Sequence, residues 1–419
     1  MKITFQGGIR EIGGSCTVVK TENAQVALDY GINLDQGITD GLPKDLDAII
    51  ATHAHLDHSG NLLTMADKHT PIIGSKATRD VTSELLHDLI KVQRMNGKDI
   101  PYNSDDVNKI KELWLPRERV ALTGMEISLQ PAGHVLGANM ACLKTEGKTI
   151  IYTGDFCLHN TDMLDGANLQ GLPINPDILI MESTYGGVVR PNRVELINTM
   201  LSKISETLEK GGNVLIPSFA FHRTQEMALR IDAALKEGSI PRCKAYYISR
   251  LAHRITRHFD NYKNLLGKSV REEKMPFAYK RVKHLRKVQD IAEPAVVICT
   301  SGFGHAGASL HLLKEWAENE DNLVIISSGY LPPDSPLKIA QEKKIIENNG
   351  NSVPVKAKIE QIELSAHADQ VELSEFVRTL KPKRTFLVHG ELLQCQAIAG
   401  QITDYTDVSI PEAHETVCI

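Results

Sequence analysis

Four side chains that can bind a metal lie within six residues near the start of the chain: His53, His55, Asp57 and His58. An apolar stretch at 47–51, typical of a strand, precedes them, and a helical pattern at 61–68 follows. Imidazole and carboxylate groups are ligands that suit Zn²⁺. Because residues i and i+2 of an extended loop point the same way, His53 and His55 can bind one ion. Asp57 and His58, on the following turn, can face a second ion.

Two further residues fit this cluster. His134 lies in a Gly-rich turn at 131–137, after a strand, and Asp155 stands at a strand end within 152–156. Taken alone, His134 would be a structural histidine and Asp155 a turn residue. The alternative for the residues at 53–58 is a run of exposed histidines at the start of a helix. Their order along the chain, directly after buried strands, favours metal ligands.

The pattern of apolar residues predicts the elements that position these side chains. The first half of the chain has short strands broken by Gly and Asp turns and interrupted by helices, which indicates a layered α/β architecture. The strands are expected at 26–28, 48–50, 149–152 and 178–181, and the helices at 77–96 and 105–113.

From about Arg190 a stricter alternation predicts a separate parallel-sheet domain built from βα units. Its helices are expected at 194–210 and 224–237, and its strands at 213–217, 295–299 and 323–326. Near Val353 the short-strand pattern returns, and it ends at 385–389.

Composition excludes several classes of protein. The 419 residues are 42% hydrophobic and 24% charged, which is typical of a globular protein of two or three domains and excludes a mostly disordered chain. Without a run of 18 apolar residues or an apolar N-terminal segment, we expect neither a membrane span nor a secretory signal. The seven Cys form no CxxC pair, which indicates a reducing compartment, the cytoplasm.

The net charge of −5 hides an uneven distribution. Residues 242–287 contain 14 Lys and Arg against three acidic residues. Aromatic residues are interleaved with them: Tyr246, Tyr247, Phe259, Tyr262, Phe277 and Tyr279. Basic clusters with stacking side chains are typical of single-stranded nucleic acid binding. A solvated helical face is the alternative that charge alone leaves open.

These motifs resemble those of a known family. Asp29, the cluster at 53–58, His134 and Asp155 match the metallo-β-lactamase fold motif by motif. Three later segments resemble the first, second and third motifs of the β-CASP nucleases, at 182–186, 365–369 and 388–391. The resemblance extends from residue 1 to about residue 395. It points most closely to prokaryotic homologues of the cleavage and polyadenylation specificity factor endonuclease subunit.

The resemblance implies a fold and a division into domains. The fold is of class α/β, a four-layer αββα metallo-β-lactamase fold with an inserted β-CASP domain that contains a parallel sheet. The metallo-β-lactamase domain is expected at 1–186 and 356–419, and the β-CASP domain at 187–355. The implied active site lies in the cleft between the two domains.

The resemblance also implies two Zn²⁺ ions per chain. One would be bound by His53, His55, His134 and Asp155, and the other by Asp57, His58, Asp155 and His389. A hydroxide between the metals would attack phosphorus, since a two-metal site activates water at neutral pH. Mn²⁺ or Fe²⁺ can occupy such ligands as well.

Catalytic roles carried over from the family fall on Asp57, His367, Glu182 and Asp29. His367 would be the general acid near the leaving oxygen. Glu182 would orient His367, and Asp29 would steer a ligand histidine from behind. Asp57 would, in addition to binding metal, hold the proton of the nucleophile.

The candidate substrate contacts are Ser301, Gly302, Gly304 and Ser365. The first three lie in a Gly-rich turn that follows a strand and opens a helix, a place suited to a phosphate group. A plain tight turn is the alternative. His389 at the third motif resembles the RNA-processing branch of the family, because the DNA-repair branch has an apolar residue there. The expected partner is therefore single-stranded RNA.

Together these features predict a zinc-dependent ribonuclease that cuts single-stranded RNA within the chain. The alternatives are a 5′-3′ exonuclease, a hydrolase of the same fold acting on DNA or a small ester, and a non-catalytic RNA-binding scaffold. The basic inserted domain and His367 argue against a small-molecule hydrolase, and the full ligand set argues against a scaffold. A di-iron redox enzyme would have Glu in place of His55. We expect a cytoplasmic protein that binds no membrane and that can form homo-oligomers.

Overall fold

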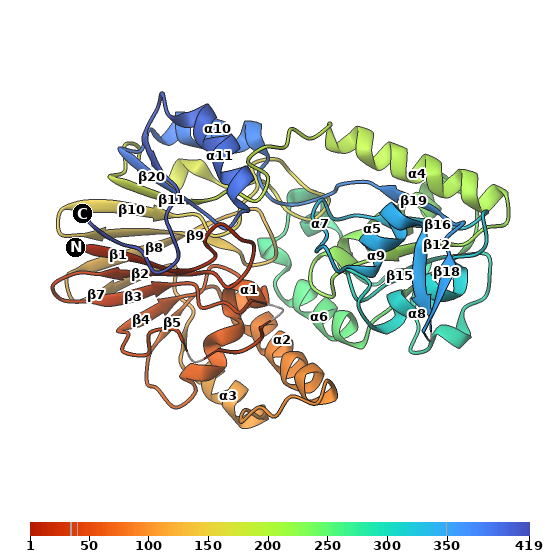
Figure 1. Ribbon diagram of the computed structural model, residues 1–419, viewed down its shortest axis with the longest axis horizontal. Coiled ribbons are helices and arrows are strands. Elements are labelled where there is room, and N and C mark those ends of the chain that lie inside the picture. The colour runs from red at the N-terminus through yellow and green to blue at the C-terminus, as the bar shows by residue number, and fades with distance from the viewer. Residues whose placement is uncertain (34–35, 40, 349) are drawn as a thin grey trace. The chain divides into compact units, whose positions relative to one another are not determined.

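The computed structural model describes residues 1–33, 36–39, 41–348 and 350–419. The chain divides into two compact units, whose elements are numbered along the chain in Figure 1. Unit 1 consists of Met1–Val189, Asn264–Lys268 and Ala366–Ile419. Unit 2 consists of Arg190–Lys263 and Ser269–Ser365.

Unit 1 contains two seven-stranded sheets. The strands of the first sheet, in spatial order, are β22 (Thr416–Cys418), β1 (Lys2–Gly7), β2 (Cys16–Lys20), β3 (Gln25–Leu28), β4 (Ala48–Ile50), β5 (Ile72–Ile73) and β6 (Trp114–Leu115). Those of the second are β21 (Asp407–Ser409), β20 (Arg384–Val388), β11 (Ile178–Glu182), β10 (Lys148–Tyr152), β9 (Asn139–Thr145), β8 (Met125–Pro131) and β7 (Arg119–Leu122). The sheets pack face to face, because one cluster of buried side chains draws on both.

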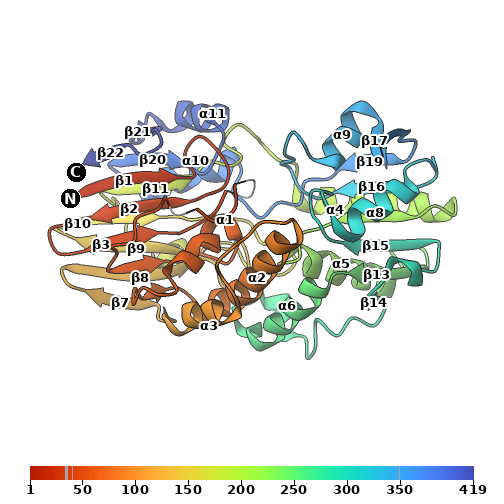
Figure 2. The same ribbon diagram turned by 60° about the horizontal axis from the view of Figure 1, so that its bottom comes forward.

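Helices cover the outer faces of the two sheets (Figures 1 and 2). Those on the first sheet are α1 (Leu56–Ser59), the 3-10 helix Gly60–Met65, α2 (Lys76–Met95) and α3 (Ser104–Glu112). Those on the second sheet are α10 (Gln370–Leu380) and α11 (Leu392–Ile402), and a 3-10 turn follows β10 at Leu169–Gly171. The predicted layering of helix, sheet, sheet and helix is confirmed.

The burial of alternate residues explains how these sheets form. In β8 the side chains of Met125, Ile127 and Leu129 are buried, and their neighbours are exposed or partly exposed. This alternation puts one face of the strand on the core between the sheets. All three residues of β4 are buried, as expected for a strand that is covered on both faces.

Unit 2 contains a six-stranded parallel sheet. Its strands, in spatial order, are β14 (Val282–His284), β13 (Lys244–Ile248), β15 (Ala295–Cys299), β12 (Val214–Pro217), β16 (Leu323–Ile326) and β19 (Lys358–Gln361). One face is covered by α4 (Arg193–Glu209) and α5 (Arg223–Glu237), and the other by α8 (Gly307–Trp316) and α9 (Pro336–Lys343). Between these elements lie α6 (Arg250–Asn261), α7 (Lys268–Glu272), the 3-10 helices Lys263–Leu265 and Val288–Asp290, and the hairpin of β17 (Ile345–Asn348) and β18 (Asn351–Pro354).

The units change at positions that differ in part from the predicted 187–355 insertion. The chain returns to unit 1 at Ala366, because β19 pairs with β16 and so extends the sheet of unit 2. The short segment Asn264–Lys268 also belongs to unit 1, where the backbone N of Gly267 donates to the carbonyl oxygen of Met163 at 2.8 Å.

Two further observations concern the cysteines and the helices. All seven cysteines are free thiols, in agreement with the absence of a disulfide pattern in the sequence. Within the described part of the chain, every helix is too short or too polar to traverse a lipid bilayer.

A glycine fixes the segment 53–58 in place. Tyr30 N donates to the carbonyl oxygen of His58 at 2.8 Å, so the two backbones run against each other. Gly31 lies at the point of closest approach, and a Cβ there would overlap the carbonyl group of Asp57. Only glycine lets the backbones come this close.

We expect Gly31→Ala to lower the free energy of unfolding by about 2 kcal/mol or more, because the added Cβ forces the backbone to move. Gly400→Ala is the matched control, since no atom lies within 4 Å of its added Cβ, and the residue lies inside α11. That substitution should stabilise by about 0.5–1 kcal/mol. Thermal unfolding of the two full-length variants measures the difference, and equal midpoints would show that the close approach is not needed.

Candidate metal centre

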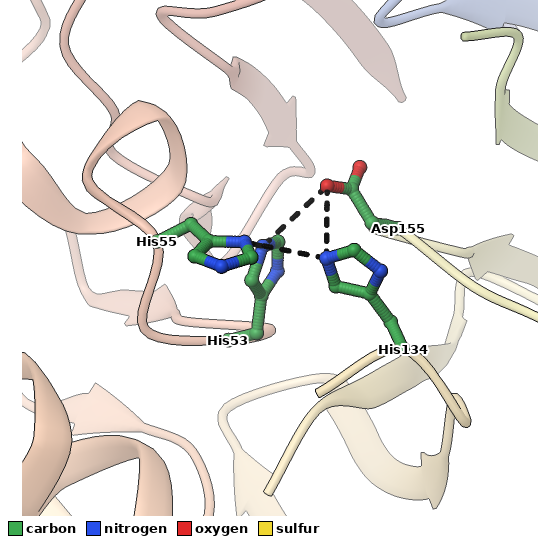
Figure 3. A group of neighbouring side chains, drawn as sticks. All are labelled: His53, His55, His134 and Asp155. Atoms are coloured by element: carbon green, nitrogen blue, oxygen red, sulfur yellow. Dashed lines mark hydrogen bonds and ion pairs between the residues drawn. The ribbon is translucent and has the colours of Figure 1, made fainter. Parts of the chain in front are cut away.

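One group of potential metal ligands forms at strand ends. His53 and His55 follow β4, His134 lies in the turn between β8 and β9, and Asp155 follows β10 (Figure 3). Nδ1 of His55 lies 3.1 Å from Nε2 of His53 and 3.2 Å from Nε2 of His134. Oδ2 of Asp155 lies 3.5 Å from Nε2 of His53 and 3.6 Å from Nε2 of His134. Four ligand atoms therefore converge.

A second group consists of Asp57, His58 and His389. The first two lie on α1, and His389 follows β20 in the left-handed region with φ of 49°. Nε2 of His389 lies 3.3 Å from Nε2 of His58 and 3.5 Å from Oδ2 of Asp57. These three residues also turn their ligand atoms toward one another.

Asp155 belongs to both groups. Its Oδ2 lies 3.3 Å from Nε2 of His58, in addition to its contacts with the first group. Its Oδ1 lies 3.2 Å from Nδ1 of His389 but accepts no hydrogen bond from the residues that the structure describes. Because the side chain is only 2% exposed, this oxygen lacks the partner that a buried carboxylate requires.

The donor atoms fit a bound metal ion. With bonds of about 2.0–2.1 Å, the ligand atoms around tetrahedral zinc lie roughly 3.3 Å apart. These distances between ligand atoms of the first group range from 3.1 to 3.6 Å. Hydrogen bonds cannot satisfy all of these contacts, because a neutral imidazole has a single proton to donate. A cation would satisfy them together.

Burial and charge set the protonation of these groups. Burial lowers the pKa of His53 and His134 well below the usual value and lowers that of His55 to about 4. These imidazoles therefore stay neutral near pH 7, as metal ligation requires. Burial alone would also lower the pKa of His58, but the carboxylates of Asp155 and Asp29 raise it well above its usual range.

The pKa values of the Asp155 and Asp57 carboxylates are lowered by the histidines around them. Burial alone would raise the pKa of Asp155, but the neighbouring His389 and His58 hold it well below its usual range. The pKa of Asp57 is likewise lowered, because His58 and His389 outweigh the effect of burial. Both carboxylates are therefore ionised near pH 7 and carry the negative charge that attracts a cation.

Asp29 orients a ligand histidine. Its Oδ2 accepts hydrogen bonds from Nδ1 of His58 at 2.7 Å and from the hydroxyl of Tyr152 at 2.8 Å. Its Oδ1 accepts one from the backbone N of Thr52 at 2.7 Å. Because Nδ1 of His58 is held by Asp29, its Nε2 is the nitrogen that faces the second group. In the same way, Nδ1 of His134 donates to the carbonyl oxygen of Ala366 at 2.8 Å.

Glu182 and His367 form a pair beside these ligands. Nδ1 of His367 lies 2.8 Å from Oε2 of Glu182. Glu182 ends β11, is 1% exposed, and also accepts hydrogen bonds from the backbone N of Phe156 at 2.8 Å and the hydroxyl of Thr184 at 2.6 Å. Nε2 of His367 lies 4.0 Å from Oδ2 of Asp155, so it is turned toward the shared carboxylate.

The four predicted substrate contacts lie in unit 2 and are not part of this group: Ser301, Gly302, Gly304 and Ser365. The hydroxyl of Ser301 accepts a hydrogen bond from the backbone N of Ala306 at 3.2 Å, so it closes its own turn. Ser365 is 6% exposed, and its carbonyl oxygen accepts a hydrogen bond from Nη1 of Arg190 at 2.9 Å. Their contact with substrate stays a prediction.

Sequence reasoning missed three supporting hydroxyl groups, those of Thr52, Tyr152 and Thr184. The first two hold Asp29 and the third holds Glu182. Thr52 directly precedes His53, and that adjacency was the available signal. A further small group also escaped notice, in which Cys157 and Glu372 lie beside His159.

The prediction that the aromatic residues of the basic segment 242–287 stack on nucleic acid is wrong for four of them. The aromatic residues Tyr246, Tyr247, Phe259 and Phe277 are each no more than 6% exposed, because they lie in the interior of unit 2. They cannot stack on nucleic acid bases. Many of the Lys and Arg side chains around them are exposed, Lys283 and Lys287 among them.

Three domain profiles match the chain in succession. The Metallo-beta-lactamase superfamily matches residues 9–186, the Beta-Casp domain matches residues 224–335, and the Zn-dependent metallo-hydrolase RNA specificity domain matches residues 352–411.

Curated relatives match over most of the chain. The chain is 30% identical to Probable RNase MJ4 of Methanocaldococcus jannaschii over an alignment of 438 positions that covers all of both proteins. It is 33% identical to transcription termination factor FttA of the same organism, over 96% of this chain and 69% of that protein. Its identity to cleavage and polyadenylation specificity factor 73 of Drosophila melanogaster is 30%, over 93% of this chain and 60% of that protein.

A solved structure has the same fold. It is a protein of unknown function from Enterococcus faecalis V583, with a TM-score of 0.59 and 14% identity over 99% of each chain. At that identity the likeness concerns the fold alone, and the family follows from the sequence relatives. Since the match to the archaeal RNase runs the full length of both proteins and the three domain profiles occur in order, this chain belongs to the β-CASP ribonucleases of the metallo-β-lactamase fold and is a metal-dependent hydrolase.

Proposed function

We propose that the protein is a zinc-dependent endoribonuclease that hydrolyses phosphodiester bonds of single-stranded RNA. One observation carries this proposal: a buried carboxylate, Asp155, is shared by two groups of ligand side chains and faces the pair of Glu182 and His367. The relative named as an RNase and the match to the RNA specificity domain support RNA as the substrate class.

The ligand side chains would hold two ions. His53, His55 and His134 would bind one, Asp57, His58 and His389 the other, and Asp155 both. Zinc suits this set of imidazole and carboxylate donors, and Mn²⁺ is the alternative metal. When bound, two such ions activate water and stabilise charge on the attacking and leaving oxygens of a phosphodiester.

The residues of the chain itself supply the proton transfers. Glu182 holds Nδ1 of His367, so the proton available to a leaving oxygen is the one on Nε2. The carboxylate of Glu182 would stabilise a proton on His367, as in other carboxylate–histidine pairs. The Asp57 side chain is 21% exposed, against 2% for Asp155, so we assign it the proton of the attacking water.

Charge distribution supports a polyanionic substrate. Unit 2 carries 26 Lys and Arg against 20 Asp and Glu, a balance of +6, although the whole chain has a net charge of −5. Residues 242–287 carry a balance of +11, which exceeds this total, so the remainder of unit 2 is acidic. Positive charge that gathers on one unit attracts phosphate groups and releases their counterions.

Incubation with a 5′-labelled single-stranded RNA and the matching DNA tests the function. With Zn²⁺ or Mn²⁺ added, we expect internal fragments from the RNA only. Asp155→Asn should lose most of its bound metal and all cleavage, because the carboxylate serves both groups of ligands. Asp177→Asn, which changes an aspartate of unit 1 that pairs with Lys383, is the matched control and should keep both.

Other outcomes would change the proposal. Release of mononucleotides alone would indicate a 5′-3′ exonuclease. Cleavage of DNA alone, or of neither strand with two metal ions bound per chain, would contradict the ribonuclease proposal. Full activity of Asp155→Asn would contradict the shared-carboxylate mechanism.

His367→Gln should lower the rate of cleavage by roughly 10²–10⁴ and leave the metal content unchanged, because general acid catalysis contributes about that factor. Single-turnover cleavage and elemental analysis of the same preparation measure the two properties. His69→Gln, at an exposed position, is the control for loss of a histidine. Loss of metal from His367→Gln would make His367 a ligand and not an acid.

Reversal of charge at Lys283, Arg286 and Lys287, which are exposed on β14 and after it, should weaken RNA binding by roughly tenfold or more. The slope of log affinity against log salt should fall by about 2, since each phosphate contact contributes about 0.7 for a single strand. The matched control reverses Lys2, Lys20 and Lys144, exposed residues of unit 1. Equal effects of the two triple variants would show that the basic segment is a solvated surface with no specific role in RNA binding.

A further inference from the structure

Aromatic rings meet at the carboxyl end of the parallel sheet of unit 2. Phe219 follows β12, Phe303 follows β15, and Tyr330 follows β16. The rings of Phe219 and Phe303 are perpendicular, with centroids 4.9 Å apart, and the ring of Tyr330 lies 6.3 Å from that of Phe303 at 78°. Phe219 is 39% exposed, which is unusual for a side chain of this size.

The backbone beneath Phe219 keeps its ring in place. A Cβ on Gly302 would lie 2.9–3.0 Å from three atoms of that ring, so the glycine backbone packs directly against it. The edge contact with Phe303 restrains the ring further. The exposed part of Phe219 is therefore presented to solvent by a side chain with little freedom left to lose on binding.

The position of these rings in the sheet is that of a ligand site. β12 and β15 are neighbours, and the helices that follow them, α5 and α8, pack on opposite faces of the sheet. In open α/β sheets, ligands bind outside the carboxyl ends of the strands at the point where the connections diverge in this way. Phe219 and Phe303 are the first aromatic residues on the two diverging connections.

We propose that the ring of Phe219, held in place by the perpendicular ring of Phe303 and by Gly302, forms a stacking platform for a base of single-stranded RNA. The proposal rests on the proposed function, which names RNA as the substrate, and it adds a base-binding subsite on unit 2. Stacking suits a nuclease of broad substrate range, because every base offers an aromatic face.

Charge favours RNA over an apolar protein segment as the occupant. Unit 2 has a balance of +6, so the platform belongs to the unit that attracts a polyanion. In the proposed function the basic segment 242–287 would supply phosphate contacts, but four of its aromatic residues are buried and cannot stack. Phe219, restrained by Phe303, supplies the aromatic surface that those residues do not.

Binding of RNA by the full-length chain in chelator, which prevents cleavage, tests the platform. The probes are a labelled oligouridylate of about ten nucleotides and an abasic oligomer with the same number of phosphates. Phe219→Leu should weaken oligouridylate binding by roughly tenfold and leave abasic binding and the salt slope unchanged, because it removes a stacking face and no charge. Phe219→Trp should keep the wild-type affinity.

The controls separate stacking from loss of structure. Tyr405→Leu removes an exposed aromatic ring of unit 1 and should leave both affinities unchanged. Phe303→Leu is the second platform variant and should act like Phe219→Leu, so a folding defect of one variant does not decide the test. Thermal unfolding shows which variants are intact.

The outcomes distinguish this proposal from the proposed function. If the wild-type chain binds oligouridylate and the abasic oligomer equally, or if folded Phe219→Leu binds like the wild type, the platform is overturned and the ribonuclease proposal stands. If the wild-type chain binds neither probe and cleaves no RNA, both proposals are overturned.

Discussion

The interior of unit 1 has to hold a carboxylate and several imidazoles with their polar atoms pointed at one another. His53, His58, His134 and Asp155 are all almost fully buried, and their nitrogen and oxygen atoms lie within hydrogen-bonding range in more pairs than the available protons can satisfy. Such a cluster is unfavourable by itself, since buried polar groups without partners raise the free energy of the folded state. A bound cation removes that penalty, so the site must be held open by the scaffold around it.

The two sheets provide that scaffold. β4, β10, β11 and β20 all end near the same place, so residues from 29 to 389 contribute to one centre. A further ring of hydrogen bonds fixes these side chains from outside: Asp29 holds the ligand His58, and Glu182 holds His367, which lies beside the ligands. These carboxylates are in turn held by hydroxyl groups of Thr52, Tyr152 and Thr184. Each layer of contacts reduces the freedom of the layer inside it, which keeps the ligand atoms directed at one place.

Much of this arrangement could be predicted from local sequence, and the rest depends on contacts that are remote along the chain. The predicted strand at 48–50 and helix at 224–237 match β4 and α5 to within one residue, because apolar periodicity and turn residues define both ends. The chain returns to unit 1 at Ala366, whereas the sequence predicts a domain boundary at residue 356. β19 has a weakly apolar edge-strand pattern that does not reveal which sheet it joins. The role of Tyr152 was invisible, since its partner Asp29 lies 123 residues away.

The roles of the aromatic residues of unit 2 also depend on contacts that are remote along the chain. Interleaving of aromatic and basic residues in 242–287 is a composition signal, and composition does not distinguish a ring that stacks on a ligand from one that fills a core. Tyr247 and Phe259 are core residues because α6 and the neighbouring strands need apolar surface to pack, whatever the charge beside them. Phe219, Phe303 and Tyr330 are far apart in sequence, and only the strand order β15, β12, β16 brings their loops together. In a parallel sheet the ligand-binding edge is thus set by the order of the strands, which no single segment of the sequence encodes.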